Sequence, residues 1–561
     1  MKNRVLVILF VFSFSGIFAQ VEDAWVYFKD KPNEASYFAT PLNMLTQRSL
    51  DRRERYSIPL DSKDVPIEAS YVSKINETPV SILARSKWLN ALHIQGTKAE
   101  IDALVNLEID GNYFVASIEF ANRSLNGSKP SKIKNKIRPK KKNVSTLTNF
   151  DYGNAENQIL MLGADTLHLN NFTGDGMQIA VIDAGFPKVD SLLAFKRLRD
   201  NGQILGGYDF VNRSTDYDTG GSSHGQIVLS IIGGYLKNGV DGATSNYVGT
   251  APDAKFYLFI SENAPVEVKL EESLWVEAAE RADSLGVDVI NTSLGYSVFF
   301  DNPNHNYDYN DMDGQTAFIT RGAEIAFSRG MILVNSAGNE GNDPDWPYIN
   351  APADGPSVLT IGAVKSDRNI ATFSSYGPTS DGRIKPDVCA QGQATAIINT
   401  SSNVSSGNGT SYSSPVMAGV IACLWQAFPN KTNAEIIQLV KESGHLYDIS
   451  IAPIPTVDYQ MGYGIPDFSS IFASLNEEEL EIDNDGILFY PNPSSNRIHI
   501  KFPKDINTLK VSIFSISGTM IFKNEIERTN PDVDISTLST GLYLLKIESG
   551  KEIKEFKLLK N

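Results

Sequence analysis

The middle of the chain alternates short apolar runs with longer amphipathic ones. Most of the short runs are rich in valine and isoleucine, and they predict buried strands; the runs are Met177–Ile182, Lys255–Ile260, Val287–Ile290, Met331–Val334 and Val358–Val364. Between them, Leu270–Leu285 and Ala317–Phe327 carry apolar residues at helical spacing. Buried strands that alternate with helices predict an α/β domain over residues 150–475, in which helices cover both faces of a parallel sheet.

The two ends of the chain have different patterns. Residues 20–125 combine the strand-like Trp25–Phe28 and Tyr113–Phe120 with the helix-like Lys98–Leu107, which predicts a small α+β domain. Residues 487–561 alternate apolar and polar positions with a period of two, as in Arg497–Phe502. Short strands of this kind, separated by turn residues, predict a small all-β sandwich.

Two charged stretches separate these domains. Residues 126–149 include Lys129–Lys142, which has seven lysines and one arginine among 14 residues and no acid. Like charges extend a chain, so we interpret this stretch as a linker that is open to proteolysis. A patch for anionic surfaces is the alternative, but two prolines and the lack of aromatic residues disfavour it. Residues 476–486 carry six acids and predict a hinge.

The first 19 residues have the pattern of an export signal. Lys2 and Arg4 precede the apolar run Val5–Phe12, and small residues lead to Ala19. We interpret residues 1–19 as a cleaved signal peptide. A membrane anchor is disfavoured because the run is shorter than the ~20 residues that a span needs. The longest later apolar stretch, Pro415–Phe428, has the length of a buried core helix, so we expect no membrane span.

Composition narrows the function classes. Apolar residues make up 42% of the 561 and charged residues 21%, which excludes wholesale disorder. The net charge of −16 disfavours nucleic acid as a partner, because binding to a duplex needs a basic face. The two cysteines, Cys389 and Cys423, have apolar neighbours, which favours two buried free thiols over a disulfide.

Four polar residues stand at predicted strand ends or helix starts. Asp183 ends the first strand, His224 precedes an apolar helical run, and Asn339 follows a strand in a glycine-flanked turn. Ser411 lies in a glycine-rich turn before an apolar helix. Each has a structural alternative when taken alone, since Asp and Ser cap helices, Asn forms turns and a lone His is often a surface residue.

Together these residues form the set that acyl transfer requires. A serine hydroxyl needs a base, and the base needs an acid that fixes its tautomer. A helix N-terminus and a side-chain amide stabilise the oxyanion. We expect Pro415 in the first turn of its helix, where proline is tolerated, so that Ser411 stands at the helix N-terminus. The chain order Asp183, His224, Ser411 is the order found in subtilisin.

Residues 150–475 resemble a subtilisin-like serine peptidase domain of the subtilase family. The resemblance is carried by several motifs, which include Val181–Phe186, Ser223–Gly225 and Gly409–Pro415, although Gln226 stands where threonine is usual. It implies that Asp183, His224 and Ser411 form the catalytic triad and that Asn339 is the oxyanion donor. It further implies that two segments form walls of the peptide groove; these are Ser293, Leu294 and Gly295, and Ser336, Ala337 and Gly338.

The resemblance implies no cofactor for the chemistry. Asp308, Asp311 and Asp313 could bind a structural calcium ion, but their spacing does not fit an EF-hand loop. An acidic surface loop is therefore the favoured interpretation.

The flanking domains fit the same family pattern. Residues 20–125 occupy the place of a subtilase propeptide, which by family habit assists folding and blocks the groove until it is cut. Tyr490–Pro493 and Gly541–Leu545 resemble the C-terminal sorting domain of type IX secretion in Bacteroidetes. This resemblance implies passage across the outer membrane, followed by release or surface attachment. The alternative for the last domain is an ordinary carbohydrate- or partner-binding sandwich.

Our main expectation is a secreted serine endopeptidase that acts on polypeptides. Two alternatives remain open. The first is a catalytically inactive adhesion protein with the same fold, since fold alone does not dictate function. The second is an acyl hydrolase that acts on esters.

Overall fold

The computed structural model describes residues 20–126, 150–218, 221–447 and 459–482, and all of 487–560 except 491, 493, 495, 503–505, 516–517 and 551–552. The predicted signal peptide and nearly all of the predicted basic linker lie outside the described residues. The chain forms two compact units, with the boundary between Ile471 and Phe472.

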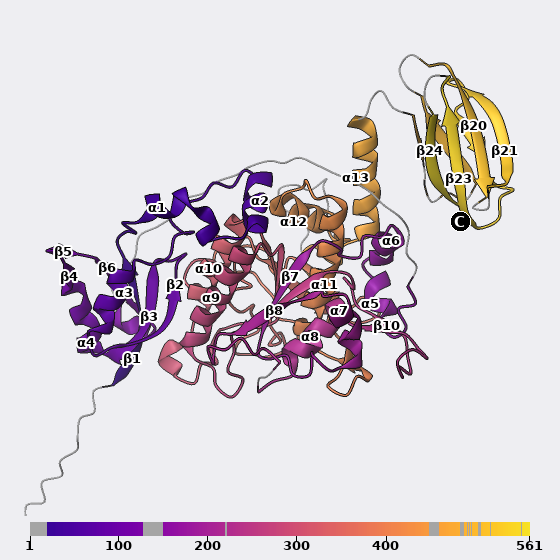
Figure 1. Cartoon of the computed structure of the whole chain (residues 1–561). Helices are drawn as coiled ribbons and strands as arrows, with labels where there is room; N and C mark the ends of the chain where they lie inside the picture. The colour runs from indigo at the N-terminus through magenta and orange to yellow at the C-terminus, as the bar shows by residue number, and fades with distance from the viewer. Residues whose placement is uncertain are drawn as a thin grey trace, which may run out of the picture. The chain divides into compact units, whose positions relative to one another are not determined.

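A seven-stranded parallel sheet forms the centre of the first unit (Figure 1). In spatial order its strands are β15 (Val388–Gln391), β14 (Leu359–Val364), β13 (Ile332–Ser336), β12 (Val289–Thr292), β7 (Gln178–Asp183), β11 (Lys255–Ile260) and β8 (Ile204–Asp209). Five of them are the strands expected from the apolar runs. The predicted α/β architecture is therefore confirmed.

Helices cover both faces of this sheet. α9 (Lys269–Leu285) packs with α10 (Phe318–Ser328), whereas α11 (Thr410–Ala427) packs with α8 (His224–Gly233) and along β12 to β15. Strand side chains alternate between the faces. Ala180 and Ile182 of β7 join the core cluster that contains α9 and α10. Ile179 and Val181, which are equally buried, take the alternate positions and so face the other layer.

Residues 20–126 form an α+β subdomain, here called the N-terminal subdomain. Its antiparallel sheet has the order β2 (Ser81–Ser86), β3 (Ala91–Thr97), β1 (Val21–Phe28) and β6 (Val115–Phe120). The sheet packs on α9 and α10. In this interface the ring of Trp25 in β1 stacks on the ring of Phe318 in α10, with centroids 4.7 Å apart. Its helices are α1 (Glu34–Ala39), α2 (Gln47–Arg55), α3 (Ala69–Asn76) and α4 (Lys98–Ala103).

Shorter elements complete the first unit. The strands are β4 (Glu108–Ile109), β5 (Asn112–Tyr113), β9 (Tyr235–Leu236), β10 (Tyr247–Val248), β16 (Thr395–Ile398) and β17 (Val404–Gly407). The helices are α5 (Glu156–Leu160), α6 (Ala164–Leu169), α7 (Lys196–Asp200) and α12 (Asn433–Glu442). Cys389 and Cys423 are buried, and among the described residues neither forms a disulfide, as predicted. Within the described ranges, no helix combines the length and the apolar character that crossing a bilayer requires.

The second unit contains the predicted β-sandwich. One sheet has the order β18 (Leu488–Tyr490), β19 (Arg497–Lys501) and β22 (Asp532–Asp534). The other has the order β21 (Met520–Glu527), β20 (Thr508–Ser515), β23 (Gly541–Glu548) and β24 (Ile553–Lys560). Alternate residues of both sheets, such as Ile498 and Ile513, form one core.

The hinge predicted over residues 476–486 is partly wrong. Helix α13 spans Phe468–Ile482, so residues 476–482 are helical. Four of these seven residues are glutamate, a good helix former, which allows the helix to continue.

Candidate active site

The predicted site residues lie at the carboxyl edge of the parallel sheet. Asp183 is the last residue of β7, residues 293–295 follow β12, and Ser336 is the last residue of β13. These three strands are neighbours. β7 also marks the point where the strand order reverses, since β8 and β11 lie on one side of it and β12 to β15 on the other. Ligands of open α/β sheets bind at such a point.

Asp183 and His224 are in direct contact. Nδ1 of His224, the first residue of α8, lies 2.8 Å from Oδ1 of Asp183. Gly225 permits this approach, because a Cβ at this position would lie 2.7 Å from the carbonyl oxygen of Gly185 and 2.9 Å from Cβ of Asp183. The side chain of Asp183 is only 2% exposed, whereas that of His224 is 31% exposed. One ring nitrogen of the imidazole therefore lies against a buried carboxylate, while the side chain remains accessible from outside.

Opposing effects set the pKa of His224. Burial lowers this pKa, whereas the charge of Asp183 and the hydrogen bond to it raise it, and the net result lies above the ordinary value of 6.5. Glu262, just past the end of β11, adds to the rise. Its carboxylate accepts a hydrogen bond from the hydroxyl of Tyr296 at 2.8 Å. Burial raises the pKa of Glu262 itself to about 7.

Ser411 is the second residue of α11, at the end of the helix where backbone N–H groups are free. Its hydroxyl donates to the carbonyl of Ser293 at 3.2 Å. In the described part of the chain, no hydrogen bond joins this hydroxyl to His224. The helices that carry these residues, α8 and α11, are nevertheless adjacent, because the ring of Tyr412 stacks on the imidazole of His224 with centroids 6.2 Å apart.

The expectation that Pro415 falls in the first turn of its helix is wrong. Helix α11 begins at Thr410, so Pro415 is its sixth residue. Proline has no N–H to offer to the carbonyl of Ser411, four residues earlier. That carbonyl instead accepts a hydrogen bond from Oγ of Ser293 at 3.0 Å. The hydroxyl of each of these two serines thus donates to the backbone carbonyl of the other. This pair of hydrogen bonds fixes the start of α11 against the end of β12.

The loop that carries Asn339 is tied to the first residue of α11. The N–H of Thr410 donates to Oδ1 of Asn339 at 2.8 Å, and the Thr410 hydroxyl donates to the carbonyl of Gly338 at 3.0 Å. With its oxygen held, Asn339 has Nδ2 left as a donor, and among the described residues no acceptor receives it. The structure therefore brings an uncommitted amide donor to the start of the helix that carries Ser411.

Asn350 lies between the two predicted groove walls. Its N–H donates to the carbonyl of Ala337 at 3.3 Å, and its Cβ would lie 2.8 Å from a Cβ at Gly295. A Cβ at Gly338 would lie 2.7 Å from the carboxylate of Glu340. Glycine at both positions therefore lets Asn350 and Glu340 pack closely against these walls. Leu294 is half-buried and packs against the main core.

Three residues that contribute to the site were not identified from the sequence. Tyr412 covers the imidazole, Thr410 holds the Asn339 loop, and Glu262 acts on the charge of His224. Tyr412 and Thr410 flank Ser411 in the recognised motif, and Glu262 lies two residues past the end of β11. The rule that functional residues gather at the carboxyl ends of strands could have drawn attention to Glu262.

The three aspartates considered for calcium have other partners. The side chain of Asp308 accepts the N–H of Asn310, and Asp311 pairs with Arg123 of the N-terminal subdomain. Asp313 accepts the N–H of Gln315. In the described ranges, no group of three or more metal-ligating side chains is present. Asp308 is exposed, as expected for an acidic surface loop, whereas Asp311 is buried and differs from that expectation.

Comparison with known families agrees with this geometry. Residues 174–464 match the model of the Subtilase family. Residues 23–141 match the Peptidase S8 propeptide domain of Bacteroidota, and residues 488–561 match the Secretion system C-terminal sorting domain. The first match covers just over half of the chain, so the chain belongs to the subtilase family.

Individual relatives align with about half of this chain. The subtilisin of Bacillus pumilus is 31% identical over 285 residues, which cover 50% of this chain and 87% of that protein. Subtilisin NAT of Bacillus subtilis subsp. natto is also 31% identical, with coverage of 50% and 63%. Subtilisin-like protease SBT6.1 of Arabidopsis thaliana is 29% identical, with coverage of 49% and 24%. The chain thus spans less than two thirds of the last two relatives.

Proposed function

We propose that this chain is the precursor of an exported serine endopeptidase. In the proposed mechanism, Oγ of Ser411 attacks the carbonyl carbon of the scissile peptide bond while His224 takes the hydroxyl proton. His224 then gives this proton to the leaving amine, and water later hydrolyses the acyl group from Ser411 with His224 again acting as the base. Asp183 orients His224 and balances the charge that it gains.

The oxyanion that forms in this reaction needs donors. We assign this role to Nδ2 of Asn339 and the backbone N–H of Ser411. A donor that is already aimed at the developing charge acts without reorganisation, and losing one such donor should cost about 3 kcal/mol.

The contact between Asp183 and His224 is the observation that carries this proposal. A carboxylate on Nδ1 leaves Nε2 as the atom that can face a serine hydroxyl. The hydroxyl of Ser411, which donates to Ser293, has to turn toward His224 for catalysis. Such bonds often tighten only when substrate is bound, so the present arrangement is compatible with the mechanism.

We assign the other parts of the chain as follows. Residues 1–19 are a signal peptide. Residues 20–125 with the linker 126–149 are a propeptide that blocks the peptide groove until it is cut. Residues 150–475 carry catalysis, and residues 487–561, after the acidic segment 476–486, direct type IX secretion to the cell surface or beyond. The matches to a propeptide domain and a sorting domain support these assignments. Polypeptides are the proposed substrates.

A serine-directed covalent probe tests the catalytic proposal. The probe should label Ser411 in the processed protein, and the Ser411→Ala variant should neither react nor cleave casein. His224→Ala should also lose labelling, because the hydroxyl then lacks its base. A processed protein that is not labelled and cleaves nothing would instead support an adhesion protein. Parallel assays on matched peptide and ester substrates separate a peptidase from an ester hydrolase.

A further inference from the structure

A segment of the N-terminal subdomain extends far from the predicted groove. We call residues 41–65, which include α2, the arm. Arg48 of the arm donates to the carbonyls of Gly286 at 2.9 Å and Gly176 at 3.0 Å, and pairs with Asp288. Gly176 lies two residues before β7, and Asp288 directly precedes β12. The arm therefore lies at the amino edge of the parallel sheet, the edge opposite to Asp183.

The length of β7 separates the arm from the candidate active site. This strand has six residues, and at about 3.3 Å per residue it spans roughly 17 Å. The arm can therefore contact the α/β domain without contacting the residues that we assign to catalysis.

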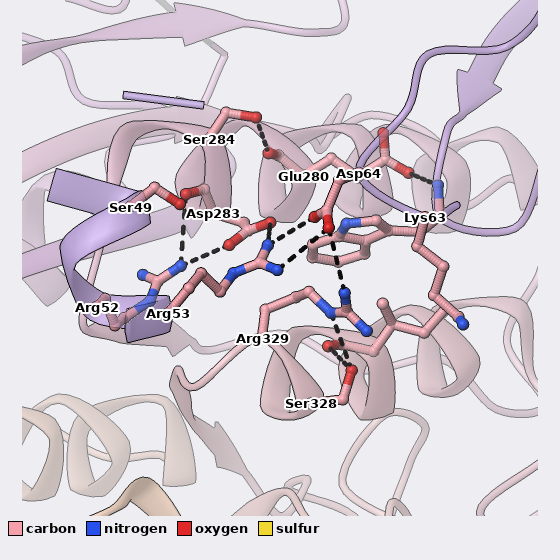
Figure 2. Close-up of polar contacts among 12 residues, drawn as sticks. Ser49, Arg52, Arg53, Lys63, Asp64, Glu280, Asp283, Ser284, Ser328 and Arg329 are labelled. Carbon is pink, nitrogen blue, oxygen red and sulfur yellow. Dashed lines mark hydrogen bonds and ion pairs between the residues drawn. The ribbon is translucent and has the colours of Figure 1, made fainter. Parts of the chain in front are cut away.

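A buried cluster of charges joins the arm to the α/β domain (Figure 2). Asp283, in the last turn of α9, pairs with Arg52 and, at 2.7 Å, with Arg53. Arg53 also pairs with Asp64 of the arm at 2.7 Å. Arg329, at the end of α10, completes the cluster by approaching Asp64 at 3.6 Å.

Asp283 of the α/β domain has both of its arginine partners in the arm, and Arg52 of the arm pairs with Asp283. The carboxylates of Asp283 and Asp64 are 0% exposed, and the side chains of Arg52 and Arg53 are 3% exposed. Burial of an unpaired charge is far more costly than burial of a pair. Loss of Asp283 would remove the ion pair of Arg52 and would leave Arg53 with Asp64 as its acidic partner.

Apolar contacts extend the same interface. The ring of Tyr56 stacks on Trp425 of α11 with centroids 5.9 Å apart, and its hydroxyl donates to the carbonyl of Pro429. Gly286 and Gly330, which follow α9 and α10, let the arm approach closely. A Cβ at either position would lie 2.8 Å from the arm, at Arg48 or at Ile58.

We propose that the arm is a second anchor, which holds the N-terminal subdomain on the peptidase independently of the groove and of the linker. Cleavage within residues 127–149 then yields a complex of two fragments. The time for which the propeptide stays bound is controlled by the Asp283 cluster, at the edge of the sheet opposite to catalysis. This inference rests on the proposed function, because it treats the subdomain as a propeptide.

The release rate of the cut subdomain tests this proposal. All variants carry Ser411→Ala, so that the chain does not cut itself, and a recognition sequence for a site-specific protease within residues 129–142. After cleavage and dilution, gel filtration over time gives the fraction of N-terminal fragment that remains bound. We expect the two fragments to elute together for hours. Immediate separation would overturn the proposal.

Substitutions in the arm interface provide the decisive comparison. Asp283→Ala should speed release by at least about a hundredfold, because truncating one partner of a buried charge pair acts on the dissociation rate. Lys74→Ala is the matched control, since the Lys74–Glu77 pair is exposed and lies within the subdomain; its release rate should change by less than about threefold.

Arg48→Ala is the second variant if Asp283→Ala does not fold. The Arg48–Asp288 pair is partly exposed, so its loss should speed release by about tenfold. If both variants fold and both release the fragment at the wild-type rate, the proposal is overturned. If only Arg48→Ala folds, a wild-type release rate in that variant overturns it. Release is measured without peptidase activity, so its outcome is independent of whether a serine-directed probe labels Ser411 in the active chain.

Discussion

The side-chain amide of Asn339 is held by its oxygen, which accepts the N–H of Thr410. Its nitrogen is the group that we assign to the oxyanion. Asn339→Ala should therefore lower kcat by about 10²- to 10³-fold with little change in KM, because the lost interaction exists mainly in the transition state. Steady-state kinetics on a peptide substrate measure this.

Asn339→Asp is the matched control for the position of this loop. The aspartate keeps an acceptor for Thr410 but replaces the donor with a negative charge, so the loss of kcat should be at least as large. If either variant retains more than a tenth of the wild-type kcat, Asn339 is not an oxyanion donor.

The charge near His224 predicts a pH dependence. Catalysis needs the neutral imidazole, and the pKa of His224 is raised above 6.5 by Asp183 and Glu262 against the effect of burial. Activity should therefore appear as the pH rises through this raised pKa. Glu262→Gln removes the negative charge that Glu262 carries above its own pKa of about 7, which lowers the pKa of His224, so the acidic limb of kcat/KM should move to lower pH.

Glu156→Gln controls for the loss of a carboxylate elsewhere, since Glu156 is exposed on α5. Its profile between about pH 5 and 9 should match that of the wild type. A limb that stays in place, or moves upward, in Glu262→Gln would show that Glu262 does not act on His224.

The four proposed catalytic residues could be selected from the sequence because their motifs stand beside strong strand and helix patterns. Residues that act on them through space were harder to find. Glu262 influences His224 although 38 residues separate them in the chain, and no local spacing reports that proximity. Its place just past β11 became meaningful only once β11 was seen to pair with β7.

At the scale of elements, burial decides what the sequence reveals. Apart from its first residue, Lys255, β11 is apolar because both faces of the sheet are covered, so its run stands out in the sequence. Helix α2 is the opposite case. Among its nine residues only Leu50 is apolar, and its buried residues are Ser49, Arg52 and Arg53. Such a helix has no apolar stripe to detect, because its burial depends on acids such as Asp283 that lie far away in the chain.

Pro415 and Ser293 provide a test at the start of α11. The carbonyl of Ser411 lacks a helical N–H partner because residue 415 is proline, and the Ser293 hydroxyl replaces it. Ser293→Ala should therefore leave this partly buried carbonyl without its hydrogen bond, at a cost of about 1 kcal/mol in stability. The midpoint of urea unfolding, measured in the Ser411→Ala background, should fall.

A second substitution isolates the cause. Pro415→Ala supplies the missing N–H, so Ser293→Ala should be less destabilising in that background than in the presence of Pro415. Equal shifts in the two backgrounds would mean that the Ser293 hydroxyl stabilises the protein by some other contact.

At the scale of the whole molecule, the N-terminal subdomain shares a core with the α/β domain. Trp25 and Trp88 belong to the same buried cluster as Trp275 and Phe318. Removal of residues 20–125 would expose this apolar face of α9 and α10 to water. We expect a chain without these residues to fold poorly and to give little active protein. Equal active yields with and without the subdomain, measured by probe labelling of Ser411, would contradict its proposed role in folding.

The C-terminal sandwich should behave in the opposite way. Its core is formed by its own strands, and the chain divides before it at Ile471 and Phe472. Deletion of residues 487–561 should therefore leave kcat/KM on a peptide substrate within about twofold of the full-length value. The same deletion should trap the protein in the periplasm, because the segment that matches a sorting domain is lost.

Cell fractionation followed by immunoblotting distinguishes these compartments. Full-length Ser411→Ala is the control, since it lacks the proposed nucleophile but keeps the whole sandwich, and it should reach the outside of the cell. Normal extracellular levels of the truncated chain would contradict the sorting role that we propose for the sandwich. A truncated chain that is exported poorly and also inactive would instead place the sandwich within the structure that supports catalysis.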